Sequence, residues 1–368
     1  MSTTSTQPTT AVPEPMPERR RRGVRIGPQV YLVGVFIAVA IVGTLASPYF
    51  LTVRNIENIV VAASVVAVLG VAQFFVVVTR GIDLSVGSIA ALATVIAAVM
   101  LRQGNGVWTT IVVTVMSCAF CGLVNGVLVV YARITPFVAT LAMMSIARGV
   151  AFIVQVGTLI VISNQEFLQL FGGRSAGVPN VVIIALTVTV VAAFAMKFSP
   201  LGRRLYALGG NPEAARLSGL PVNRDTLMAY VTSGLLAGLA GLMLAGRLSQ
   251  GSSLVGQGYE LDSIAATVVG GTSLFGGTGD PVSTVLGALV IGMIGNIMNL
   301  MGIQSEPQLV IRGIVILLAV FLTSGRGIQR IRDGIATLLR RFRRDVPAPE
   351  PEPIDAPVKT IDAPTPRP

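Results

Sequence analysis

The sequence predicts an all-α polytopic membrane protein with about ten transmembrane helices and both termini in the cytoplasm. Of the 368 residues, 52% are hydrophobic and only 12% are charged, and the mean hydropathy is +0.76. Soluble proteins carry about 25% charged residues, which keep their surfaces hydrated. At half that density there is too little polar surface to cover a soluble fold, so we expect the chain to lie within a membrane.

Ten apolar runs lie between the charged residues of the chain. A helix needs about 20 apolar residues to cross a hydrocarbon core of about 30 Å. Six runs precede a basic loop, Lys197–Asp225, and four follow it; the eighth is short. The runs are Val30–Phe50, Asn58–Thr79, Leu84–Leu101, Trp108–Tyr131, Pro136–Val161, Val181–Met196, Thr226–Gly246, Ser263–Thr278, Pro281–Met301 and Pro307–Gly325.

The distribution of Lys and Arg supports an even number of crossings. With the N-terminus in the cytoplasm, six crossings return the basic loop to the cytoplasm and four more return the C-terminus. Four cations then lie outside and two lie within crossings, and all the others are cytoplasmic, as the positive-inside rule requires. The four are Arg54, Arg102, Arg174 and Arg247, and the two are Arg148 and Arg312.

Composition divides the chain into four regions. Residues 1–26 are rich in Ser, Thr, Pro and Arg and are expected to form a disordered cytoplasmic tail. Residues 27–326 form the transmembrane domain, with a cytoplasmic loop at about 197–225. Residues 327–345 combine arginines with apolar residues at helical spacing, as in an amphipathic helix on an anionic lipid surface. Residues 346–368 are a proline-rich tail, expected to be disordered.

Several kinds of chemistry are excluded by the residues present. The chain has no histidine, which removes a His-ligated metal site and a His general base. Cys118 and Cys121 are too few for a disulfide framework or a four-thiolate site. No GxxxxGK[ST] phosphate loop and no catalytic pairing of side chains occurs, so an enzyme is not expected. The net charge of +10 follows from the positive-inside pattern, so no nucleic-acid partner is expected either.

The basic loop contains a short helix with caps at both ends. Asn211 is a favourable N-cap, Pro212 suits the first helical turn, and Gly219 suits the left-handed position that ends a helix. The glycines at 209 and 210 are expected to be flexible. A helix of about two turns is marginal in water, so something must hold it. Either the membrane domain or a cytoplasmic partner could provide the surface against which this helix packs.

Two stretches, Thr79–Ser88 and Gly270–Gly279, interrupt the apolar pattern in the two halves of the chain. Transporters often break helices in corresponding positions of their halves, where the substrate passes. Asp83 in the first stretch is either a functional acid or a helix cap with Arg80 as a nearby countercharge. Sparse polar residues inside the runs either bond between helices or line a solute path. The candidate path or helix-break residues are Asp83, Ser85, Asn125, Thr140, Gly271, Thr272 and Asn296.

Three stretches together resemble one protein family. They are TRGIDLSVGS at 79–88, GGNPEAARLSGLPV at 209–222 and YELDSIAATVVGGTSLFGGTG at 259–279. In this order they are similar to the membrane permeases of bacterial ABC importers for simple sugars, the ribose, xylose and arabinose group. The resemblance runs from about Val30 to Arg326 and leaves both tails uncovered.

The resemblance implies a multi-pass permease in the bacterial inner membrane that works by alternating access. It implies four kinds of partner: an ABC ATPase that binds ATP and Mg²⁺, an extracytoplasmic sugar-binding protein, a second permease copy and membrane lipids. No cofactor is expected on this chain itself. The alternatives are an ABC permease for a nucleoside, autoinducer or amino acid, and a stand-alone channel or secondary carrier. The resemblance places the ATPase-coupling helix at Gly210, Asn211, Pro212, Glu213, Ala214, Arg216 and Gly219.

Overall fold

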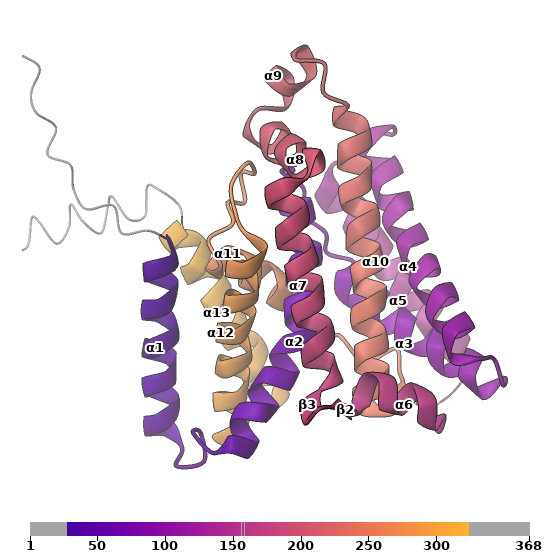
Figure 1. Cartoon of the computed structure of the whole chain (residues 1–368), viewed down its shortest axis with the longest axis vertical. Coiled ribbons are helices and arrows are strands. Elements are labelled where there is room, and N and C mark those ends of the chain that lie inside the picture. The colour runs from indigo at the N-terminus through magenta and orange to yellow at the C-terminus, as the bar shows by residue number, and fades with distance from the viewer. Residues whose placement is uncertain (1–27, 156, 158, 324–368) are drawn as a thin grey trace, which may run out of the picture.

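The structure is a computed structural model that describes residues 28–155, 157 and 159–323. The segments predicted at 1–26, 327–345 and 346–368 lie outside the described residues. Helices dominate the described part, and Figure 1 shows most of them side by side along one direction. They are α1 Pro28–Ala46, α2 Val53–Val77, α3 Val86–Arg102, α4 Val107–Val130, α5 Pro136–Gln155, α6 Gln165–Gly172, α7 Asn180–Phe198, α8 Pro200–Gly210, α9 Pro212–Leu217, α10 Val222–Leu248, α11 Tyr259–Val269, α12 Pro281–Leu300 and α13 Ser305–Thr323.

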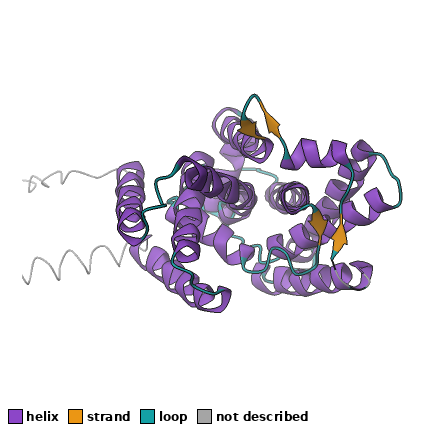
Figure 2. Ribbon diagram, turned by 90° about the horizontal axis from the view of Figure 1, so that it is seen from below, coloured by secondary structure: helices purple, strands orange, loops and turns teal. Residues whose placement is uncertain are grey.

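Two short antiparallel strand pairs lie in the connections between helices, as Figure 2 shows. Strand β1 (Ile160–Val161) pairs with β4 (Gln250–Gly251), and Ile160 lies opposite Gly251. Strand β2 (Arg174–Ser175) pairs with β3 (Val178–Pro179) in the connection between α6 and α7. The first pair joins the loop after α5 to the chain that leaves α10.

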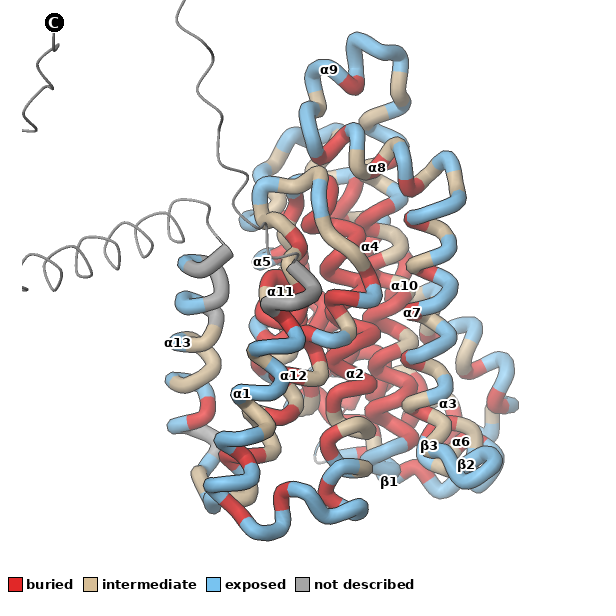
Figure 3. Tube along the Cα trace, turned by 60° about the vertical axis from the view of Figure 1, so that its left-hand side comes forward, coloured by how far each residue is buried: buried red, intermediate tan, exposed pale blue. Residues whose placement is uncertain are grey.

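Helices α2 and α10 form the centre of the bundle, together with most of α3 (Figure 3). The apolar window of α2 is 83% buried and that of α10 is 67% buried, against 28% for α5 and for α7. Because α5 and α7 lie at the periphery, they expose large apolar side chains such as Ile153 and Val190. A water-soluble protein would hide such side chains, whereas here they fit a lipid surround.

The two ends of the bundle differ in what they carry. Helices α8 and α9 lie at one end, which we call the α9 end, and α6 with β2 and β3 lies at the opposite end, the α6 end (Figure 1). Helix α2 finishes at the α9 end, because Gly277 donates to the carbonyl of Val78 while Gly209 lies against the same carbonyl. Helices α2 and α12 therefore run in opposite directions, with the start of α2 and the finish of α12 at the α6 end.

Six described helices are long and apolar enough to cross a membrane: α2, α4, α5, α7, α10 and α12. The structure corrects the predicted run Ser263–Thr278, which is not a continuous helix. Helix α11 has 11 residues and ends at Val269, so it is only about 16 Å long, half of the hydrocarbon thickness. Gly271 and Gly277 follow it with left-handed backbone, which no helix accommodates. The fifth predicted run is also shorter, because α5 ends at Gln155.

Candidate functional site

Helix α9 lies outside the bundle with both predicted caps in place, which confirms the local prediction. Asn211 accepts hydrogen bonds on Oδ1 from the amides of Glu213 and Ala214, both at 3.1 Å. At the other end Gly219 has a φ of 78°, the left-handed geometry that ends a helix. The side chain of Leu217 is 82% exposed. Sequence reasoning missed this exposed apolar residue, although its place in a basic loop was a signal.

Helix α8 is the second element at this end, and the sequence analysis did not predict it. Ser199 caps it by accepting from the amide of Gly202 at 3.2 Å, and Pro200 occupies the first turn. The expectation that residues 209 and 210 are flexible is wrong, because they form the last turn of α8. The Tyr206 hydroxyl donates to the Gly279 carbonyl at 2.8 Å. Burial raises the pKa of this phenol, and the nearby Asp280 carboxylate raises it further.

An arginine joins α8 to the loop between α2 and α3. Arg80 donates from Nε to the Gly209 carbonyl at 2.7 Å and from Nη2 to the Gly210 carbonyl at 2.5 Å. A Cβ atom on Gly209 would lie 1.8 Å from the Val78 carbonyl oxygen, so only glycine fits there. Arg80 therefore contacts α8 and is not the countercharge of Asp83 that the sequence suggested. We call Arg80, Gly209 and Gly277 the α9-end junction; all three motifs of the family resemblance meet in it.

Asp83 is fully buried in the irregular segment that precedes α3. Its Oδ1 accepts from the amide of Ser85 at 2.9 Å and from the Ser85 hydroxyl at 2.5 Å. Its Oδ2 accepts from the Ser233 hydroxyl at 2.7 Å. Asn125 donates from Nδ2 to Ser85 Oγ at 2.9 Å, and Thr140 donates to the Ile82 carbonyl at 3.3 Å. The structure thus brings four predicted path residues around one buried segment, and a role for them in a solute path stays a prediction.

The C-terminal half has a second non-helical segment, Gln250–Gly258, which begins with β4, buries Ser252 and Ser253 and leads directly into α11. Side chains of two other helices satisfy its backbone: Thr94 accepts from the Ser252 amide at 3.1 Å, and Gln155 from the Ser253 amide at 2.6 Å. Arg148 donates to the Ser253 and Val255 carbonyls at 2.5 and 2.9 Å. Irregular backbone is tolerated at membrane depth only where protein groups satisfy it in this way.

Thr79–Ser85 and Gln250–Gly258 are both non-helical and lead directly into the helices α3 and α11. Gly87, at the start of α3, touches the second one, because a Cβ there would lie 2.7 Å from the Gly256 carbonyl oxygen. The second interruption expected from the sequence, Gly270–Gly279, is also non-helical, because α11 ends at Val269 and α12 begins at Pro281. That stretch, which includes Gly271 and Thr272, follows the end of α11 and packs against α8 at the α9 end.

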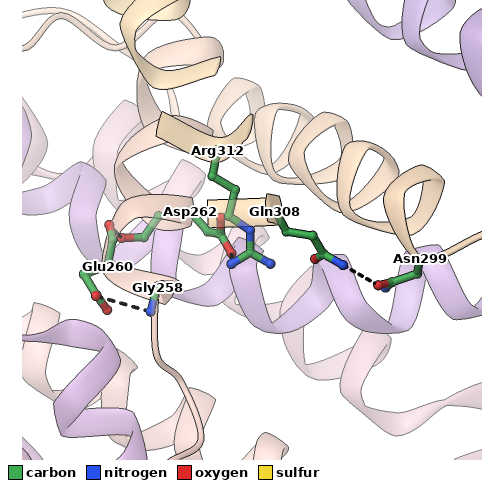
Figure 4. Close-up of polar contacts among 7 residues, drawn as sticks. Gly258, Glu260, Asp262, Asn299, Gln308 and Arg312 are labelled. Carbon is green, nitrogen blue, oxygen red and sulfur yellow. Dashed lines mark hydrogen bonds and ion pairs between the residues drawn. The ribbon is translucent and has the colours of Figure 1, made fainter. Parts of the chain in front are cut away.

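A polar cavity of about 460 Å³ lies between α2 and the helices α10 to α13. Figure 4 shows part of its wall, where Arg312 Nη1 lies 3.1 Å from Asp262 Oδ2 and Gln308 donates to Asn299 at 2.9 Å. Of the predicted path residues only Asn296 lines it. The lining residues are Asn55, Asn58, Ala62, Val66, Arg247, Tyr259, Asp262, Ile291, Gly292, Gly295, Asn296, Asn299, Leu300, Gln308 and Arg312.

The sequence contained a signal for this cavity. Arg312 lies inside an apolar run, where an ionisable side chain by default indicates function. Its partner Asp262 was overlooked because the predicted run began one residue later, at Ser263. The amides of Asn55 and Asn296 bond reciprocally at 2.9 and 2.8 Å across 241 positions of sequence, a pairing that only the fold reveals.

The fold and these contacts define a polytopic helical transport protein, in which α3 touches the non-helical segment before α11, with a polar cavity and a capped helix outside the bundle. Comparison with known families gives the particular assignment. The model of the family described as "Branched-chain amino acid transport system / permease component" matches residues 55–320, and the chain belongs to this family. It is accordingly a multi-pass permease of the bacterial inner membrane, as predicted.

Several permeases named for sugar transport are similar to the chain. It is 42% identical to the ribose import permease protein RbsC of Escherichia coli (strain K12) over 298 residues, 80% of this chain and 92% of that protein. It is 38% identical to the D-allose transport system permease protein AlsC of the same strain over 287 residues, 78% of this chain and 88% of that protein. It is 36% identical to the L-arabinose ABC transporter permease protein AraH of Azospirillum brasilense over 328 residues, 89% of this chain and 96% of that protein. These similarities confirm the family resemblance. No solved structure matches the chain.

Proposed function

We propose that the chain is the translocating permease subunit of an ATP-driven importer for a simple sugar. The observation that carries the proposal is its similarity, over more than three quarters of its length, to permeases named for ribose, allose and arabinose. In this proposal its partners are an ABC ATPase, an extracytoplasmic sugar-binding protein, a second permease copy and the surrounding lipids. ATP and Mg²⁺ bind to the ATPase, and this chain holds no cofactor.

The proposed topology has ten crossings with the α9 end in the cytoplasm. Five cations support this side, because short loops retain Lys and Arg on the cytoplasmic face. Two of the ten crossings are composite, since Thr79–Ser85 precedes α3 and Gln250–Gly258 precedes α11. Both termini then emerge in the cytoplasm. The five cations are Lys197, Arg203, Arg204, Arg216 and Arg224.

The ATPase docks on α9 in this proposal. The side chains of Glu213, Ala214, Arg216 and Leu217 are all exposed there, while Ala215 is buried. Leu217 supplies an apolar anchor, and the two charged side chains supply a polar rim around it, the usual anatomy of a protein interface. Asn211, Pro212 and Gly219 shape the helix, and Gly210 joins it to α8.

Movement of α9 reaches the membrane domain through α8. The Arg204 guanidinium lies 2.9 Å from the Asp225 carboxylate at the start of α10, and the α9-end junction fixes the last turn of α8 to the loops before α3 and after α11. A tilt of α9 would therefore shift both composite crossings together. Such a coupled shift is what alternating access between the two sides of the membrane requires.

The first test is affinity purification of the chain from its own membrane, followed by mass spectrometry of the proteins that come with it. We expect an ABC ATPase to co-purify, and reconstituted vesicles with the binding protein to take up a simple sugar only with ATP. Sugar flux without ATP or partners would favour a stand-alone channel or carrier and overturn the proposal. ATP-driven uptake of a nucleoside, autoinducer or amino acid, with no sugar transported, would overturn the substrate class.

A further inference from the structure

We propose that the polar cavity between α2 and α10–α13 binds an uncharged polyhydroxylated solute during its passage, with Tyr259, Asp262 and Arg312 forming the inner wall of the site. The inference rests on the proposed function, because it names where in the chain a translocated sugar is held. Its observations are the size, position, chemistry and charge of the cavity.

The size and position of the cavity fit a solute that enters from the α6 end. Its volume of about 460 Å³ lies in the usual range of small-molecule sites, about 300–1,000 Å³. Asn55 in the first turn of α2 and Asn299 near the finish of α12 both lie at the α6 end. Asp262 lies in the first turn of α11, roughly 10 Å from the finish of that helix at the α9 end. The cavity therefore reaches from the outer side toward the middle of the domain.

The lining groups match hydroxyls, which both donate and accept hydrogen bonds. Amide side chains do the same, and five of them line the cavity: Asn55, Asn58, Asn296, Asn299 and Gln308. Within the described residues, the Asn58 amide and the Tyr259 hydroxyl make no hydrogen bond with the protein, so both are available to a solute. Tyr259 also offers the only aromatic ring in the lining.

The charge of the inner wall favours an uncharged solute. Asp262 is 4% exposed and pairs with Arg312, so these two charges of the cavity wall offset each other. Among the lining residues only Arg247 adds an unbalanced charge, and its side chain, on the last turn of α10, is exposed. A buried ion pair stabilises a fold weakly at best, and ionisable groups at membrane depth by default serve function.

Cysteine protection tests this site. In the C118A/C121A background, N58C places a thiol on the cavity wall, and Q103C places a matched exposed thiol at the α6 end outside the cavity. Right-side-out membrane vesicles are treated with a membrane-impermeant thiol reagent, with or without D-ribose, D-allose or L-arabinose. We expect the reagent to label both thiols, and the transported sugar to slow labelling of N58C several-fold but not that of Q103C.

A second variant asks whether Tyr259 takes part in binding. Y259F keeps the ring and removes only the hydroxyl, which makes no hydrogen bond within the described chain, so the fold should persist. We expect a higher concentration of the same sugar to be needed for protection of N58C in Y259F, and no change in Y131F, whose exposed ring lies outside the cavity.

The results separate this inference from the proposed function. If the vesicles take up a sugar with ATP but that sugar does not protect N58C, or N58C is not labelled while Q103C is, the inference is wrong and the function stands. Protection by ribonate or gluconate, with none by the parent sugar, would overturn the uncharged class. If no simple sugar is taken up at all, the proposed function fails, whatever the labelling shows.

Discussion

Arg80 donates from Nε to the backbone carbonyl of Gly209 at 2.7 Å, and this contact joins a loop of the N-terminal half to the helix that carries α9. Arg80 has a φ of 69°, a left-handed conformation that costs a non-glycine residue free energy. Its second bond, to Gly210, and the Gly277 amide bound to Val78 close the α9-end junction. Strain offset by specific contacts is a reason to look for function at this place.

We predict that Arg80→Gln uncouples ATP hydrolysis from uptake. Glutamine is too short and too weak a donor to reach both the Gly209 and Gly210 carbonyls, so α8 would move without the loop before α3. Reconstituted transporter should keep hydrolysing ATP while sugar uptake falls by at least about tenfold, a coupling change of about 1.4 kcal/mol. Arg80→Gly should also uncouple, although it relieves the backbone strain. Arg133→Gln is the matched control, because Arg133 is also left-handed (φ 55°) but exposed; equal loss there would contradict the prediction.

Gly219→Val should weaken α9 and abolish ATP-driven uptake while membrane insertion remains normal. No atom lies within 4 Å of a Cβ added at Gly219, so the effect comes from the φ of 78°, which β-branched residues avoid. Gly219→Asn should retain most uptake, because asparagine tolerates this conformation. Gly210→Ala is a control with equal open space but no left-handed backbone. Unchanged uptake in the valine variant would remove Gly219 from the coupling role.

Features that depend on neighbouring residues, such as helix caps, could be predicted from the sequence. The Asn211 and Gly219 caps lie within one turn of the helix they end, so residue types alone predicted α9 closely. The segment Gln250–Gly258 was missed because its hydrogen-bond partners, Thr94, Arg148 and Gln155, lie between 98 and 158 positions away. The eighth apolar run began only after Asp262, which left this residue out of helix α11, to which it belongs. Contacts of this range exist only once the helices have packed.

Asp83→Asn should leave folding and transport near normal. Asparagine Oδ1 can still accept from the Ser85 amide and hydroxyl, and its Nδ2 can donate to a reoriented Ser233 hydroxyl. Asp83→Ala leaves these buried donors without an acceptor, which costs about 1–3 kcal/mol for each, so its thermal midpoint in detergent should fall clearly. A loss of uptake in a stable Asp83→Asn transporter would instead show that the charge itself serves transport.

Arg148→Gln should destabilise the segment Gln250–Gly258 that leads into α11. The Arg148 guanidinium holds the carbonyls of Ser253 and Val255, and the shorter glutamine amide cannot reach both. Each buried carbonyl left without a donor costs about 1–3 kcal/mol, so we expect a lower thermal midpoint and faster proteolysis within 250–258. The exposed Arg102→Gln, at the finish of α3, removes the same charge without touching the segment and should change neither. Equal stability of the two variants would mean that the extended segment is held by Thr94 and Gln155 alone.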